Sequence, residues 1–268
     1  MAGNGTYEQE FTEPDLEDLK AAKTILENPS LTAQISDVIG TPIEKVFEHV
    51  PVKLRNKIGD ITHQALLQGL NIAVASLRET EQRSSRNRLH KVLAVGTGVT
   101  GGLFGFTALA VELPATTGVI LRSIADIAQS EGHDLTRLEV RLACLEVFAL
   151  GGTTAKDDTV EGGYWVARAA MAQQLSQAAA YIAEQGFAEE GAPILVRLIS
   201  KIAARYSIVV TEQAAAKLIP IVGAASGGLI NLLFMNHFQS IARGHFIIKR
   251  LESRYGTELV REKYAAVA

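Results

Sequence analysis

Apolar residues recur every three to four positions along most of this 268-residue chain, which is the spacing of amphipathic α-helices. The clearest example lies between Pro51 and Gln82, with apolar residues at Leu54, Ile58, Ile61, Ala65, Leu66, Leu70, Val74 and Leu77. The stretch 206–210 is rich in β-branched residues, but its flanks keep helical spacing and it is predicted as helix too. No run of alternating apolar and polar residues indicates a sheet. The pattern predicts an all-α protein.

Prolines, glycines and capping residues divide this pattern into separate helices. Pro14 follows a capping Thr12 or Glu13. Pro114 is expected to separate two helices, and Thr136 with Glu139 has the spacing of a capping box. The predicted helices cover about 14–28, 30–39, 51–82, 88–111, 115–130, 137–150, 164–186, 194–218 and 221–254.

Two segments, 92–111 and 218–236, contain no charged residue and are rich in glycine. Gly98 and Gly102 lie one helical turn apart, as do Gly223 and Gly227. Glycine costs a helix about 1 kcal/mol relative to alanine, so close packing against another backbone must compensate for it. The segments are therefore predicted to be two central helices of the core, or helices that dock on a membrane. Full spanning is the third alternative.

Overall composition narrows the class of protein only slightly. The net charge of −3 gives no support for a nucleic-acid binder, which usually has a basic domain. Mean hydropathy is +0.15, which is high for a soluble protein and low for a protein with many membrane spans. The single cysteine, Cys144, cannot form an internal disulfide, and the first residues lack the pattern of a signal peptide. We therefore expect a cytoplasmic location.

Charge is distributed unevenly along the chain. The first fifty residues are acidic, whereas a basic cluster stands directly before the first uncharged segment. This cluster consists of Arg83, Arg86, Arg88 and Lys91. Its position suits contact with anionic lipid headgroups, and a solvated helix end is the alternative.

Four charged residues stand in otherwise apolar sequence: Glu112, Arg122, Asp126 and Glu146. Charges on apolar helical faces are rarely buried without a partner, so a buried structural network is the first interpretation. The alternative is a hydrolase-type catalytic cluster, because carboxyl groups in apolar surroundings acquire raised pKa values.

Other chemical motifs are weak. His237 and His245 lie two helical turns apart on one face, which makes them only weak candidates for metal ligands. The glycines do not form a phosphate-binding loop, because their flanks are helical rather than strand and helix. The sequence therefore predicts no bound metal and no cofactor.

Several strings resemble the EcsC family of bacterial proteins. They are LPATTGVILRSIADIA (113–128), RLACLEVFALGG (141–152), YWVARAAMAQ (164–173), KLIPIVGAASGGLIN (217–231) and HFQSIARGHFIIKRLESRYG (237–256). The family is named for a protein encoded beside an ABC exporter. The resemblance implies a helical protein of the cytoplasm or the membrane surface, with a link to export or envelope processes, and it brings no catalytic residue with it.

These observations predict one multi-helix domain over residues 13–256, a loosely ordered N-terminus over 1–12 and a C-terminal tail over 257–268. We expect a non-enzymatic protein that associates reversibly with the cytoplasmic membrane or with an exporter-type complex. A hydrolase and a carrier of lipid or another apolar ligand remain the alternatives. Nucleic acid is not expected as a partner.

Overall fold

The computed structural model of the chain describes residues 11–27, 31–40, 42–43, 50–75, 105–152, 163–185, 192–217 and 224–267. Within these ranges the backbone forms α-helices and no strand, so the predicted all-α class is confirmed. None of the helices in these ranges combines the length and the apolar character needed to cross a membrane.

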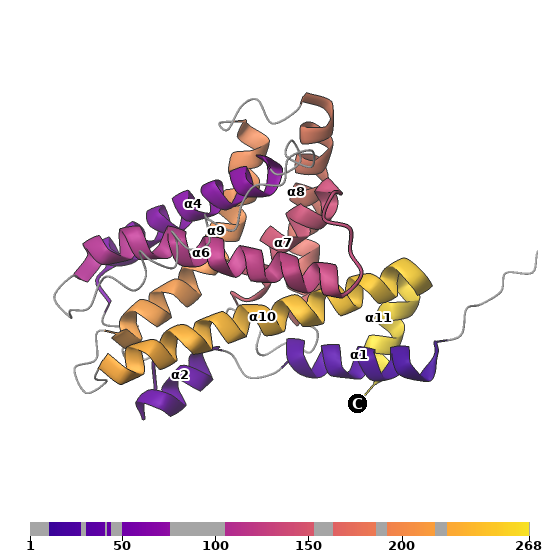
Figure 1. The fold of residues 1–268 in the computed structure, drawn as a ribbon, viewed down its shortest axis with the longest axis horizontal. Helices are drawn as coiled ribbons and strands as arrows, with labels where there is room; N and C mark the ends of the chain where they lie inside the picture. The colour runs from indigo at the N-terminus through magenta and orange to yellow at the C-terminus, as the bar shows by residue number, and fades with distance from the viewer. Residues whose placement is uncertain are drawn as a thin grey trace, which may run out of the picture.

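A long helix near the C-terminus, α10, organises the fold (Figure 1). It contacts α1, α2, α6, α7, α9 and α11. The helices are α1 (Glu13–Leu26), α2 (Leu31–Ile39), α4 (Val52–Ala75), α6 (Gly105–Ser130), α7 (Leu138–Leu150), α8 (Gly163–Gln185), α9 (Pro193–Lys217), α10 (Ala224–Tyr255) and α11 (Thr257–Ala266). Helices α7 and α9 pack against each other, and each also contacts α4, α8 and α10, so most of the apolar stripes meet in one core.

Helices α6 and α10 lie side by side and run in the same direction (Figure 1). Gln239 of α10 donates a hydrogen bond to Ser123 Oγ of α6 at 2.8 Å. Further along, His133 Nε2 donates to the carbonyl oxygen of Phe246 at 2.9 Å. Because the residue numbers rise together along both helices, the N-terminal ends of α6 and α10 lie at the same end of the molecule.

An aromatic cluster fills the core where α7, α9 and α10 meet. The ring of Phe148 lies 4.7 Å from that of Tyr206 and 5.4 Å from that of Phe238, measured between ring centroids. Tyr206 is fully buried, and its hydroxyl group forms a 3.1 Å hydrogen bond with Thr117 of α6. This bond satisfies a polar group that would otherwise be buried without a partner.

Two glycines allow close approaches between backbones. A Cβ atom at Gly152, just after α7, would collide with the backbone carbonyl of Arg205 in α9. A Cβ at Gly244 of α10 would lie 2.8 Å from the side chain of Leu26 in α1. The missing side chains therefore set how closely α9 and α1 approach their neighbours.

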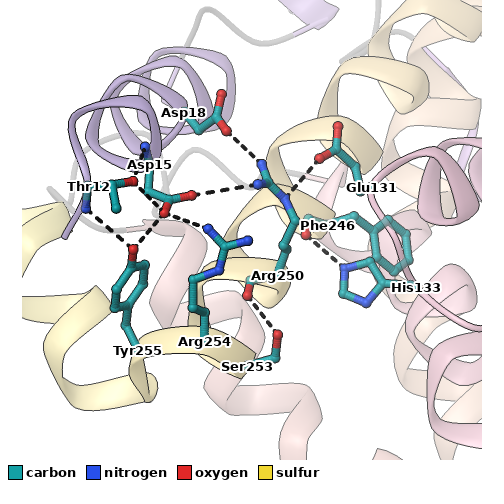
Figure 2. A network of polar contacts seen from close by, with 10 residues as sticks. All are labelled: Thr12, Asp15, Asp18, Glu131, His133, Phe246, Arg250, Ser253, Arg254 and Tyr255. Atoms are coloured by element: carbon teal, nitrogen blue, oxygen red, sulfur yellow. Dashed lines mark hydrogen bonds and ion pairs between the residues drawn. The ribbon is translucent and has the colours of Figure 1, made fainter. Parts of the chain in front are cut away.

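Polar contacts join α1 to the C-terminal end of α10 (Figure 2). The buried carboxylate of Asp15 accepts hydrogen bonds from Arg254 at 2.6 Å, from Tyr255 at 2.6 Å and from Thr12 at 2.7 Å. Burial opposes the charge, but these three hydrogen bonds outweigh it and lower the pKa of Asp15. Arg250 adds ion pairs to Asp18 at 2.8 Å and to Glu131 at 3.3 Å. We call these contacts the α1 clamp.

The predicted helix boundaries are mostly confirmed, with three corrections. Thr12 caps α1, and residues 206–210 lie within helix α9, as predicted. Pro114 does not separate two helices, because α6 continues through it from Gly105 to Ser130. Buried residues on both sides of Pro114, Leu113 and Thr117, hold this helix against the core despite the lost backbone hydrogen bond.

The other two corrections concern a cap and the C-terminus. The hydroxyl group of Thr136 donates a hydrogen bond to Asp134 and does not cap α7, whose N-cap residue is Arg137. Residues 257–268 are not merely a tail, because Thr257–Ala266 form α11, and its Val260 and Tyr264 are buried against the rest of the protein. The prediction of a loosely ordered N-terminus concerns mainly residues 1–10, which lie outside the described ranges.

The close approach at Gly152 leads to a stability prediction. Gly152→Ala places a methyl group against the backbone of α9, and overpacking of this kind costs about 1–3 kcal/mol of unfolding free energy. Gly118→Ala is the matched control, because it lies within α6 with no atom near the new methyl group and should gain up to about 1 kcal/mol. Urea unfolding followed by circular dichroism measures both values. Equal stability of the two variants would contradict the close approach.

Candidate functional site

Six polar side chains from three helices meet where α7, α8 and α10 come together. Helix α10 contributes His245, Lys249 and Glu252, whose i, i+4 and i+7 spacing places them on one face. The remaining members are Glu146 of α7 and Tyr164 and Arg168 of α8. We call this set the buried polar cluster. It has the density of titratable groups that is typical of functional sites.

An ion pair anchors one side of the cluster. The guanidinium group of Arg168 binds the carboxylate of Glu252 through two bonds, of 2.8 and 2.5 Å. The same guanidinium lies 5.4 Å from the ring centroid of Trp165. The side chains of Arg168 and Glu252 are only 19% and 9% exposed, so water screens the pair weakly. This bidentate contact fixes α8 against α10.

A chain of polar contacts runs from this ion pair into the interior. Arg168 donates to the Tyr164 hydroxyl oxygen at 3.4 Å, and the Tyr164 hydroxyl lies 3.0 Å from Nδ1 of His245. The imidazole tautomer of His245 decides whether the Tyr164 hydroxyl donates to Nδ1 or accepts from it. Nε2 lies 3.5 Å from Glu146 and forms no hydrogen bond with the described residues.

Burial dominates the electrostatics of the contact between Glu146 and His245. It raises the pKa of Glu146 to about 7, although Lys249 and Arg168 oppose the rise. It also lowers the pKa of His245 well below its usual range, and the positive charges of Lys249 and Arg168 lower it further. Both groups are therefore favoured in their neutral forms, and their contact is not a conventional ion pair.

A cavity of about 340 Å³ lies beside the buried polar cluster, between α7, α8 and α10. Its lining includes Glu139, Leu142, Glu146, Leu175, Ala179 and Lys249. Burial and the neighbouring Arg168 lower the pKa of Lys249. The cavity therefore combines an amine, a buried carboxyl group and an apolar wall, and its volume lies at the lower end of the range for small-molecule sites.

The structure does not assemble the four charged residues singled out in the sequence. Glu112, Arg122 and Asp126 are exposed, and only Glu146 is buried. The physical reason is the orientation of α6, which turns Ile120, Ile124 and Ala128 toward the core and the charged residues outward. The predicted catalytic or structural cluster is corrected accordingly, and Glu146 belongs instead to the buried polar cluster.

The two candidate metal ligands, His237 and His245, are both buried but have different partners. His237 Nε2 donates to the carbonyl oxygen of Gly151 at 2.7 Å, and burial lowers the pKa of His237. His245 contacts Tyr164 and Glu146 instead. Among the residues that the structure describes, no group of three or more histidine, cysteine or acidic side chains is placed to hold a metal ion.

Most of the residues predicted to contact a membrane or partner lie outside the described ranges. These are Arg83, Arg86, Arg88, Lys91, Gly98, Gly102 and Gly223. Gly227 lies in the first turn of α10.

Sequence reasoning missed four members of the buried polar cluster as site residues: Tyr164, Arg168, Lys249 and Glu252. One signal was present, since Tyr164 and Arg168 share a face of α8 just as the three members from α10 share theirs. The spacing of residues within α8 and within α10 does not show that these two faces meet, because their meeting depends on how the helices pack.

The raised pKa of Glu146 leads to a stability prediction. Glu146→Gln imitates the protonated carboxyl group. The folded-state pKa of about 7 lies above the ordinary value of 4.5, so the wild-type protein loses stability as pH rises through this interval. The variant should avoid that loss, with an unfolding free energy about 2–4 kcal/mol higher than wild type at pH 8 and nearly equal at pH 5.

Chemical denaturation at a series of pH values checks this expectation. The depressed pKa of His245 gives the opposite slope below pH 6.5 and is present in both proteins, so their difference isolates Glu146. A variant that is less stable than wild type at every pH would show instead that Glu146 is ionised and paired with His245.

Comparison with known proteins gives one match. The family model described as the EcsC protein family matches residues 13–251, which include the whole buried polar cluster except Glu252. No curated protein and no solved structure matches the chain.

Proposed function

The chain belongs to the EcsC protein family, and we propose that it is a non-enzymatic helical protein that associates reversibly with the cytoplasmic membrane. The proposal rests on the end of the molecule at which α6 and α10 begin. We call this end the apolar end, and it consists of the start of α6 and of residues 224–236 of α10.

The parallel packing of α6 and α10 supports the proposal. It places residues 105–111 of the first uncharged segment and residues 224–236 of the second at the same end of the molecule (Figure 1). Two segments that lie far apart in the sequence and contain no charged residue are thus brought to the same end of the molecule. Their own residues lose little by leaving water, because neither segment has an ionised group to be desolvated.

Exposed leucines on α10 are the observation that carries the proposal. Leu229 is 41% exposed and Leu232 is 53% exposed, and both lie within the uncharged segment. Fully burying a leucine side chain contributes roughly 1.5–3 kcal/mol, so each of these half-exposed side chains offers about 1 kcal/mol to an apolar partner. The hydrocarbon boundary of a lipid bilayer is such a partner.

The basic cluster that precedes the first uncharged segment supplies a second attraction. Each basic residue near an anionic membrane surface contributes about 1 kcal/mol, and this term weakens with salt. Apolar contact combined with electrostatic attraction gives reversible rather than permanent binding. An exporter-type complex would offer the alternative apolar surface.

Binding to lipid vesicles tests the role of the exposed leucines. The double variant Leu229→Ser/Leu232→Ser should bind vesicles of mixed anionic and neutral lipids about tenfold or more weakly than wild type, because two apolar contacts of about 1 kcal/mol each are lost. Co-sedimentation over a range of lipid concentrations measures the change.

Val166→Ser is the matched control for this experiment. Val166 has an apolar side chain that is 55% exposed, comparable to those of the two leucines. It lies on α8, away from the apolar end. It should bind like wild type. Equal loss in the control, or no loss in the double variant, would contradict a role for the apolar end. Binding to native membranes but not to protein-free vesicles would favour the exporter-type complex.

Salt dependence tests the role of the basic cluster. Replacing Arg83, Arg86, Arg88 and Lys91 with glutamine should weaken binding to anionic vesicles by up to about 4 kcal/mol at low salt. It should also remove most of the salt sensitivity, because fewer charges are left to be screened. The measurement is co-sedimentation at increasing sodium chloride concentration.

A control variant with the same change in net charge accompanies this test. It replaces four exposed basic residues on other surfaces, Arg197, Lys201, Arg243 and Arg261. If this control loses as much binding as the cluster variant, the attraction comes from overall charge and the cluster has no specific role.

A further inference from the structure

We propose that the cavity between α7, α8 and α10 is a binding site for a small organic acid, with Lys249 holding its carboxylate and the apolar wall holding its hydrocarbon part. The proposal goes beyond membrane association and does not depend on it. Lys249 is separated from Leu229 by twenty residues of α10, which corresponds to about 30 Å along the helix axis.

The position of Lys249 indicates the charge of the ligand. Lys249 lines the cavity, and its amine forms no ion pair with a carboxylate of the described residues, although the charges of Glu146 and Glu252 act on it from a greater distance. Its neighbours Arg168 and Glu252 are already engaged with each other through two bonds. Lys249 is thus a cation whose own counter-ion is missing from the described residues, and an anionic group in the cavity would supply it.

Glu146 favours a carboxylate over a more highly charged anion. It is 3% exposed and lines the same cavity, and burial raises its pKa to about 7. In its protonated form it donates a hydrogen bond, which a carboxylate accepts. Glu146 is surrounded by other charged or titratable groups: His245, Lys249 and Glu252 from α10, Tyr164 and Arg168 from α8, and Glu139 on its own helix.

The wall of the cavity indicates the rest of the ligand. Leu142 and Ala143 of α7 and Leu175 and Ala179 of α8 line the same cavity and contribute hydrocarbon surface to it. Glu139 lies at the edge of the cavity with a side chain 64% exposed, and it disfavours ligands with several negative charges. A volume of about 340 Å³ suits a short chain rather than a full phospholipid.

The buried side of the site has an unsatisfied polar atom of its own. His245 is fully buried, and its Nε2 forms no hydrogen bond with the described residues. Such an atom is unusual in a folded protein, and it lies directly behind Glu146. A small shift of Glu146 toward His245 gives this atom a partner, so the side chain of Glu146 can adjust when the cavity is filled.

Calorimetric titration of the full chain with octanoate tests the proposal. Octanoate carries one carboxylate and a short hydrocarbon chain, and octylamine and octanol serve as probes of the same length with positive and zero charge. We expect saturable one-to-one binding of octanoate, at least tenfold tighter than that of either comparison probe. Lys249→Met should weaken octanoate binding at least tenfold, whereas Lys20→Met, on the exposed face of α1, should leave it unchanged.

A second variant keeps the test decisive if Lys249→Met perturbs folding. Ala179→Leu fills the cavity, leaves every charge in place and should also weaken octanoate binding at least tenfold, while circular dichroism confirms the helical fold. Absence of saturable octanoate binding would overturn the proposal. So would equal or tighter binding of octylamine, or wild-type affinity in both Lys249→Met and Ala179→Leu. None of these measurements involves vesicles, so the outcome is independent of membrane association.

Discussion

The burial of helix α10 is the constraint on which the rest of the structure depends. Six of the described helices pack along α10 and α8 reaches it through an ion pair, so leaving a polar side chain unpaired on the covered faces of α10 is costly. Four such side chains find a partner on a different element: Gln239 on α6, His237 after α7, Glu252 on α8 and Arg250 on α1. These directional contacts define how each helix is oriented around α10, which apolar packing alone defines less sharply.

The sequence predicts the helices of this fold well and their contacts poorly. Helical periodicity is a local property, so the all-α class and the boundaries of α7, α8 and α9 follow from it closely. Pro114 predicts a helix end that the structure does not have. The free-energy cost of a proline inside a helix is outweighed by the packing of Leu113 and Thr117, and this packing cannot be inferred from one helix alone. Local signals fail where tertiary packing supplies the larger energy.

The candidate site, like the fold, can be predicted only in part from the sequence. The sequence predicts a role for Glu146, because a carboxyl group in apolar sequence is conspicuous wherever it packs. Asp126 looks equally conspicuous, yet it lies on the exposed face of α6. Arg168 and Glu252 look like ordinary surface charges, and only the meeting of α8 and α10 makes them a buried pair. Which charges are buried depends on how the helices face one another, and spacing within one helix does not contain that information.

The α1 clamp has a consequence for the way the protein is made. Leu19 and Ala22 of α1 are fully buried, and the chain that covers them lies more than two hundred residues further on, around Gly244. Ribosomes add about 5–20 residues per second, so α1 leaves the ribosome roughly 10–50 seconds before its partner exists. During that time its apolar stripe is available to chaperones and to other nascent chains. Helix α1 is thus made long before its partner, and this part of the fold is completed only after translation of α10.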